Sequence, residues 1–213
     1  MEFFCYHRDR PGSLGLREEL VQAHWSYMDG YAKELIARGP TFAEDGETPS
    51  GSVHIVDLPD SAAARAFAFD EPNQQAGVFR DVLLRRWRNL LGRTMWEFPG
   101  GRSGGNRYLV LGLGPGTGTG STGSAGSAGS AGSAGSAGSA GSAGSAGSAG
   151  AVVPAAWRDE LIAYGPLLSD DGTAWLGTAA LVRAPDGDAA RAVLAGERYA
   201  DVEVHPWEFG GRR

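Results

Sequence analysis

His24 is the residue of this sequence best suited to proton-transfer chemistry. An imidazole titrates near neutral pH and can act as a general acid or base when a carboxylate fixes its tautomer and supports its charged form. At helical spacing His24 shares one stripe with Leu20, Tyr27 and Tyr31, so we expect it to face the domain interior. A core histidine satisfied by one hydrogen bond fits the same position.

Two places in the sequence offer a carboxylate partner for His24. Asp9 follows the first expected strand and is the first candidate. However, a helix beginning near Leu16 carries His24 about 12 Å along its axis, level with the middle of that strand. The reserve candidates are Asp70 and Glu71, whose ordinary role in such a loop is a turn or a helix cap.

Aromatic side chains near His24 suggest a pocket for a small molecule. We expect Tyr6, Tyr27, Tyr31 and Glu71 to contact this ligand, although packing in the core is an equally ordinary role for such tyrosines. The sequence contains no motif for a cofactor, for a metal, or for a nucleophile paired with a base. We therefore expect a site that uses neither cofactor nor metal.

The composition limits the partners and the location of the chain. Its formal net charge of −6 argues against nucleic-acid binding. Cys5 is the only cysteine, which excludes an intrachain disulfide. No signal peptide and no apolar run of membrane-spanning length are present. These features predict a cytoplasmic protein with a small-molecule ligand and no membrane contact.

The elements that must position His24 alternate between strand and helix patterns in the first half of the chain. Gly39-Pro40 is typical of a helix end, and the order βαββαβ predicts an α+β, ferredoxin-like domain with one antiparallel sheet. The expected elements are a strand at 2–8, a helix at 16–38, strands at 41–44 and 52–58, a helix at 60–69 and a strand at 79–87.

A seven-residue segment occurs twice. Glu-Leu-Ile-Ala-Arg-Gly-Pro at 34–40 returns as Glu-Leu-Ile-Ala-Tyr-Gly-Pro at 160–166. We interpret this as a tandem duplication in which Gly-Pro ends the first helix of each copy. The second copy is expected to contain strands at 107–113, 174–183 and 199–205 and short helices at 157–164 and 188–195.

A tract of Gly-Ser-Ala triplets lies inside the second copy. Such a segment has little apolar surface to bury and is expected to be flexible. We predict domains at 1–99 and 107–213, the second interrupted by the repeat at 117–150. Natural expansion in a tolerant loop explains the position of this tract, and an engineered linker is the alternative.

Several short motifs follow one another in the first half, and in this order residues 2–88 resemble the YCII-related (YciI-like) domain family. The resemblance implies a ferredoxin-like fold, pairing of two domains into a dimeric α+β barrel, and a His–Asp pair formed by His24 and Asp9. The family usually has Asp directly before the proline that corresponds to Pro72 and an aromatic residue directly after it. This chain has Glu71 and Asn73 at those positions. The motifs are Tyr6-His7-Arg8-Asp9, Pro11-Gly12, Ala23-His24, Arg38-Gly39-Pro40, Asp70-Glu71-Pro72 and Ala76-Gly77-Val78.

The second copy lacks this pair, because Gly150 occupies the position of His24 and Leu113 that of Asp9. We expect the second copy to cover the open face of the first sheet, as an intrachain pseudo-dimer with one pocket. The sequence leaves open whether two such chains also pair into a homodimer.

Three functions remain for such a chain. The first is a cofactor-independent enzyme that eliminates from, or isomerises, a cyclic or aromatic substrate with His24 as general base or acid. The second is a non-catalytic module that binds a small ligand or regulates another protein. The third is an interaction protein that docks a partner through the stretch Trp87–Trp96.

Overall fold

The computed structural model describes residues 1–115, 152–195 and 199–211, so the Gly-Ser-Ala tract lies outside the described residues. One eight-stranded sheet has the order β2-β3-β1-β4-β6-β7-β5-β8. The strands are β1 (Glu2–Asp9), β2 (Leu35–Phe42), β3 (Pro49–Asp57), β4 (Phe79–Trp87), β5 (Arg107–Leu113), β6 (Leu161–Leu168), β7 (Trp175–Arg183) and β8 (Asp201–Pro206). The helices are α1 (Leu14–Glu19), α2 (Val21–Asp29), α3 (Ser61–Phe69), α4 (Pro72–Gln75) and α5 (Gly187–Arg191), with 3-10 turns at Met95–Glu97, Ala155–Trp157 and Ala192–Leu194.

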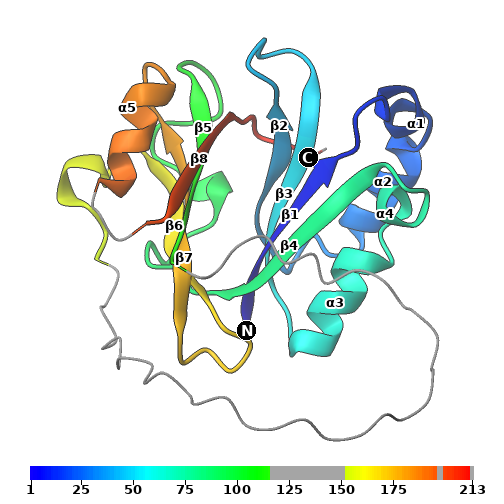
Figure 1. Cartoon of the computed structure of the whole chain (residues 1–213), viewed down its shortest axis with the longest axis horizontal. Coiled ribbons are helices and arrows are strands. Elements are labelled where there is room, and N and C mark those ends of the chain that lie inside the picture. The colour runs from blue at the N-terminus through cyan, green and yellow to red at the C-terminus, as the bar shows by residue number, and fades with distance from the viewer. Residues whose placement is uncertain (116–151, 196–198, 212–213) are drawn as a thin grey trace, which may run out of the picture.

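The strands lie between two sets of helices. Figure 1 shows α1 to α4 on one side of the strands of the first half (β1 to β4) and α5 on the far side of the strands of the second half (β5 to β8). A mixed α+β fold with an antiparallel sheet is therefore confirmed. Within the described part of the chain, no helix has both the length and the apolar composition needed to cross a lipid bilayer.

Alternation along β1 divides its side chains between two cores. Phe4 and Tyr6 belong to a central core that both halves share. Phe3 and Cys5 point the other way and pack with Met28 and other residues under α2 and α3. This period of two is the ordinary consequence of the β pleat when both faces of a strand are covered. Residues on the helix side of β1 and its neighbours can therefore meet α2, where His24 lies.

Within the described residues, strand pairing joins the two halves at two places. At one, β4 pairs with β6 through Trp87 and Leu167, and the Trp87 indole donates a hydrogen bond of 3.0 Å to the carbonyl oxygen of Gly165. At the other, Thr41 of β2 forms an isolated bridge with Trp207, just after β8. Trp87 and Trp207 are 2% and 1% exposed. A buried tryptophan at the end of the last strand of each half, or just after it, thus packs against the other half.

All but the first residue of each repeated segment lie in strands, which corrects the C-terminal part of the helix predicted at 16–38 and the helix predicted at 157–164. The helix ends at Asp29, and β2 and β6 begin at Leu35 and Leu161. A Cβ at Gly39 would overlap the carbonyl oxygen of Glu208, and a Cβ at Gly165 would overlap that of Arg88. The glycines therefore allow close approach of a chain from the other half, and tertiary pairing decides the conformation against local helix preference.

The remaining element predictions for the first half are mostly confirmed. The order βαββαβ holds, with the first helix broken at Leu20 into α1 and α2. Helix α3 begins after Asp60, whose side chain accepts a hydrogen bond from the amide of Ala63, as expected of an N-cap. The strand expected at 79–87 coincides with β4, and in the second half the strand expected at 107–113 coincides with β5. These elements carry the pocket described next.

Candidate active site

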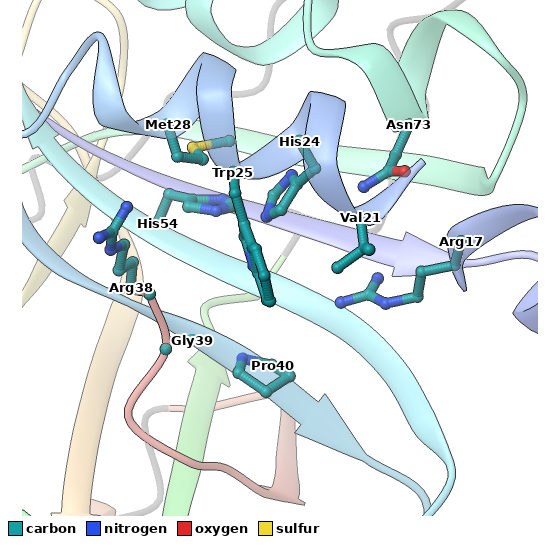
Figure 2. A pocket seen from close by; sticks show the side chains of 12 residues that line it. Arg17, Val21, His24, Trp25, Met28, Arg38, Gly39, Pro40, His54 and Asn73 are labelled. Carbon is teal, nitrogen blue, oxygen red and sulfur yellow. The ribbon is translucent and has the colours of Figure 1, made fainter. Parts of the chain in front are cut away.

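A cavity of about 130 Å³ lies between α2 and the strands β2 and β3. Figure 2 shows the Trp25 indole projecting from α2 into it, with His24 and His54 close by. The wall combines residues of the first half with two glycines from the C-terminal segment. The lining residues are Arg17, Val21, His24, Trp25, Met28, Arg38, Gly39, Pro40, His54, Asn73, Gly210 and Gly211.

His24 is paired with Glu71. The distance between His24 Nδ1 and Glu71 Oε1 is 2.7 Å, and the Glu71 side chain is fully buried. The second carboxylate oxygen accepts a hydrogen bond of 2.9 Å from the amide of Gln74. Glu71 is thus the N-cap of α4, where Pro72 occupies the first turn. This short helix fixes the carboxylate that orients the imidazole.

The surroundings of Glu71 determine which atoms carry protons. Burial alone raises the pKa of this carboxyl, but the hydrogen bond and charge of His24, together with the amides of Gln74 and Asn73, bring its pKa below the ordinary value. An ionised carboxylate only accepts hydrogen bonds, so Nδ1 of His24 carries the proton. The other ring nitrogen, Nε2, is then free to exchange a proton with a ligand.

Two further histidines lie in a row behind His24. The ring centroids of His24 and His54 are 5.9 Å apart, and those of His54 and His7 are 5.8 Å apart. Nε2 of His7 donates a hydrogen bond of 2.9 Å to the carbonyl oxygen of Ala68. Burial lowers the pKa of His7 to about 4 and that of His54 well below 6.5. Both rings are therefore neutral at neutral pH.

Some buried polar atoms beside the cavity have no hydrogen-bond partner among the described residues. They include Nδ1 of His54 and Oδ1 of Asn73. Both residues line the cavity and are only 2% exposed. A buried polar atom without a partner is costly, and a ligand that supplies one removes that cost. The cavity therefore has the polar contacts expected of a small-molecule site.

The neutrality of His7 predicts a loss of stability in acid. The folded-state pKa near 4 lies below the ordinary 6.5, so below pH 6.5 the unfolded chain binds a proton that the folded chain excludes. The stabilising contribution is complete above pH 6.5 and is lost as the pH falls towards 4. Between pH 7 and pH 5 the free energy of unfolding should fall by about 2 kcal/mol because of His7.

Urea unfolding at these two pH values checks this prediction in the wild type and in His7→Gln. Glutamine can still donate to Ala68 but does not titrate, so the variant should lose less stability between the two pH values, by about 2 kcal/mol. An equal decline in both proteins would contradict the assignment to His7.

Asp9, the first candidate partner of His24, lies against Arg17. Nη1 of Arg17 donates hydrogen bonds of 2.9 and 3.2 Å to its two carboxylate oxygens. Nη2 of Arg17 donates a hydrogen bond of 2.7 Å to Oγ of Ser52. Burial raises the pKa of Asp9 although Arg17 opposes this rise. Asp9 therefore holds Arg17 at the cavity wall, whereas the reserve candidate Glu71 contacts His24.

The three tyrosines expected in the pocket lie outside its lining. Tyr6 faces the central core, where its hydroxyl lies 3.2 Å from Oγ1 of Thr41. Tyr27 donates to backbone carbonyls of α3, and Tyr31 packs edge-on against Phe67 at a centroid distance of 4.9 Å. Glu71, the fourth residue predicted to bind substrate, contacts His24 but is likewise not among the residues that line the cavity.

Sequence reasoning did not single out Arg17, Arg38 or His54 as pocket residues. Arg38 was expected at a helix end, but it lies within β2 opposite His54 of β3. The period of two in the strand expected at 52–58 offered a signal, because it places His54 on the same side as Val56, under the helices. Within the described residues, no three His, Cys, Asp or Glu side chains converge as metal ligands do.

Known proteins resemble the first half of the chain. An uncharacterized protein of Haemophilus influenzae is 28% identical over 97 residues, which cover 42% of this chain and 99% of that protein. A solved structure of 5-chloro-2-hydroxyhydroquinone dehydrochlorinase from Burkholderia phenoliruptrix AC1100, in complex with 2,5-dihydroxybenzoquinone, is 29% identical. It covers 41% of this chain and 94% of the dehydrochlorinase, with a TM-score of 0.39. Residues 1–88 match the family model of the YCII-related domain, which confirms the resemblance predicted for the first half of the chain.

Proposed function

We propose that the chain is a small-molecule enzyme in which His24 acts as general base or acid and Glu71 orients it. The contact of 2.7 Å between His24 and a fully buried carboxylate, at the wall of a cavity, carries this proposal. A histidine that only fills space in a core needs one hydrogen bond, and a carbonyl group suffices for it. A buried carboxylate in that place supports an imidazole that gains and loses a proton.

The proposed step begins when Nε2 of His24 removes a proton from a carbon or hydroxyl group of the ligand. The electron pair of the broken bond forms a new double bond. In an elimination, a leaving group such as chloride departs with its own electron pair, and His24 later passes the proton to water. In an isomerisation, His24 returns the proton to a different atom of the same molecule. Glu71 stabilises the imidazolium that exists between the two transfers.

The size of the cavity suits a single ring. A cavity of roughly 150 Å³ holds one benzene molecule, and the volume here is about 130 Å³. The half-buried indole of Trp25 provides a flat apolar surface, while His54 and Asn73 offer polar atoms for hydrogen bonds. A monocyclic hydroquinone, phenol, enol or lactone fits this combination.

We also propose that two ferredoxin-like domains, at 1–99 and 107–213, form an intrachain pseudo-dimer. Numbered from its own first strand, each half has the strand order 2-3-1-4, which supports this arrangement. The contacts between the halves are reciprocal: the amide of Leu90 donates to the carbonyl of Tyr164 at 3.0 Å, and that of Gly210 donates to Arg38 at 2.9 Å. Duplication of one domain explains both features.

Assays with monocyclic compounds test the enzymatic role. Wild-type protein should release chloride from a chlorinated hydroquinone or shift the double bond of a monocyclic lactone. His24→Asn should lower kcat/KM by about 100-fold or more, while His205→Asn, which changes the only histidine of the second half, should retain activity. Equal turnover by His24→Asn would refute the proposal. Binding of 2,5-dihydroxybenzoquinone with no turnover of either substrate class would instead favour a non-catalytic binding module.

A further inference from the structure

A cavity of about 80 Å³ lies where the two halves meet, between α3, the strands β1 and β4, and the turn from β6 to β7. In Figure 1 this turn lies next to the N-terminus of β1. The first half supplies Phe3, Arg65 and Arg86 among other lining residues, and the second half supplies Asp170. The cavity beside His24 and this one share no described lining residue. A ligand bound here would therefore not compete with one at His24.

Three arginines line this cavity. Arg85 and Arg86 belong to β4, and Arg65 belongs to α3. Nη1 of Arg85 donates a hydrogen bond of 2.9 Å to the carbonyl oxygen of Leu84, and the guanidinium of Arg65 lies 5.5 Å from the centre of the Phe69 ring. None of the three forms an ion pair with a carboxylate of the described chain. Guanidiniums gathered in this way create a positive potential that attracts an anion.

The carboxylates of this region do not cancel the three positive charges. Asp170 is the only acidic residue among the described lining residues, and it is exposed. Asp60 is directed at the first turn of α3, where it accepts a hydrogen bond of 2.8 Å from the amide of Ala63. Asp57 pairs with the N-terminal ammonium group at 2.7 Å. The wall of the cavity therefore carries three positive charges and one negative charge.

A wider hollow of about 540 Å³ adjoins the cavity and shares Arg85 and Asp170 with it. Its other polar lining residues, Ser169, Asp171 and Thr173, all lie in the turn from β6 to β7. Asp171 accepts hydrogen bonds from the hydroxyl groups of Ser169 at 2.5 Å and Thr173 at 2.8 Å. Carboxylates and hydroxyl groups are suitable partners for the hydroxyl groups of a ligand. The hollow thus suits a polar, uncharged group beside the positively charged cavity.

The turn of the second half packs against an arginine of the first half. Gly172 has a φ of +77°, which other residues rarely adopt, and a Cβ there would lie only 2.9 Å from Cζ of Arg86. Just before this turn, Leu168 of β6 pairs with Arg86 of β4. The cavity and the hollow therefore exist only when the two halves are joined.

We infer that this cavity binds the phosphate group of a phosphorylated sugar or polyol, and that the adjoining hollow holds the hydroxyl groups of the same molecule. Guanidiniums bind phosphate through paired, charge-assisted hydrogen bonds. The apolar side chains of Phe3, Phe69 and Leu84 form the rest of the wall. They shield the guanidiniums partly from water, which strengthens their attraction for an anion. The site is independent of the proposed enzymatic role of His24.

Calorimetric titration of the full chain with glucose 6-phosphate, inorganic phosphate and glucose tests the inference. Glucose 6-phosphate should bind about tenfold more tightly than inorganic phosphate, because hydrogen bonds to the sugar add to those of the phosphate group. Glucose alone should give no measurable binding in the same range of concentration, since it lacks the charged group.

Substitution of single arginines locates the phosphate group. Arg85→Gln should weaken both phosphate ligands by about tenfold or more, the value of one charge-assisted hydrogen bond. The matched control is Arg80→Gln, because Arg80 is an exposed arginine of the same strand that pairs with Asp81 and lines neither hollow. It should keep the wild-type affinity within about twofold. If a thermal unfolding scan shows that Arg85→Gln does not fold, Arg65→Gln at an exposed position of α3 takes its place.

Asp170→Ala separates the sugar from the phosphate group. The variant loses a negative charge, so inorganic phosphate should bind at least as tightly as in the wild type. It also loses a hydrogen-bond acceptor for the sugar. The ratio between the affinities for glucose 6-phosphate and inorganic phosphate should therefore fall below the wild-type value.

Three results would overturn the inference. They are the absence of binding of glucose 6-phosphate at millimolar concentration, equal affinities for glucose 6-phosphate and inorganic phosphate, and equal affinities in Arg85→Gln and Arg80→Gln. His24→Asn should bind glucose 6-phosphate as the wild type does, because the two cavities share no described lining residue. Unchanged binding there, together with absent turnover in the wild type, would refute the enzymatic role and leave the phosphate site in place.

Discussion

Replacement of Glu71 by glutamine should lower kcat by about 10²- to 10⁴-fold on any substrate for which His24 transfers a proton. The glutamine side chain cannot stabilise an imidazolium. It can also donate its amide hydrogen to Nδ1, which would move the ring proton to Nε2 and reverse the roles of the two nitrogens. In serine hydrolases the equivalent change from aspartate to asparagine costs about 10⁴-fold through the wrong tautomer.

Asp9→Asn is the matched control for this prediction, because it also exchanges a carboxylate for an amide near the cavity. Its carboxylate contacts Arg17 rather than His24. The expected loss in kcat is below about tenfold, caused by a less well fixed guanidinium. Both variants need comparable unfolding temperatures for the comparison to hold. A larger loss in Asp9→Asn than in Glu71→Gln would make Asp9 the functional partner and contradict the arrangement proposed here.

Trp207→Ala should lower the free energy of unfolding by about 3–5 kcal/mol. The indole is 1% exposed and belongs to the central core shared by the two halves. Its truncation would leave a cavity at the joint with β2, where Gly39 approaches the backbone of Glu208. Because Trp87 occupies the reciprocal joint with β6, Trp87→Ala should cost a similar amount. Urea unfolding at pH 7 measures both changes.

Trp25→Ala provides the control of the same residue type. Its indole is half-buried at the cavity rather than enclosed in the core, so the expected cost is below about 2 kcal/mol. If Trp207→Ala and Trp25→Ala proved equally mild, the two halves would not be held together by the buried tryptophans. That result would contradict the expectation that these tryptophans stabilise the packing of the two halves against each other.

The sequence pattern correctly predicted the elements whose conformation depends mainly on local interactions. The strands predicted at 79–87 and 107–113 coincide with β4 and β5, and Asp60 caps α3 through its own side chain. The repeated segments beginning at Leu35 and Leu161 could not be assigned in this way. Leu-Ile-Ala suits a helix as well as a strand. The strand conformation depends on pairing with β3 and β7, and on the close approach of the other half at Gly39 and Gly165.

The site could be predicted only in part for a similar reason. The period of the first helix placed His24 towards the sheet, and the structure brings it to the cavity wall. Its contact with Glu71 depends on how the loop before α4 folds over α2, which no local pattern encodes. Tyr6 lies on the opposite face of β1 from that helix. Gly210 and Gly211 reach the cavity wall only because the two halves pack together. No local sequence pattern predicts this contribution.

The titration of the Glu71 carboxyl, followed by ¹³C NMR in the wild type and in His24→Leu, tests the pairing of these two residues most directly. In the wild type the pKa should lie below the ordinary 4.5, since His24 and two backbone amides outweigh burial. In His24→Leu burial remains but the imidazole is lost, so the pKa of Glu71 should rise above its wild-type value. The same pKa in both proteins would show that Glu71 does not support His24, and the proposed proton transfer would lose its basis.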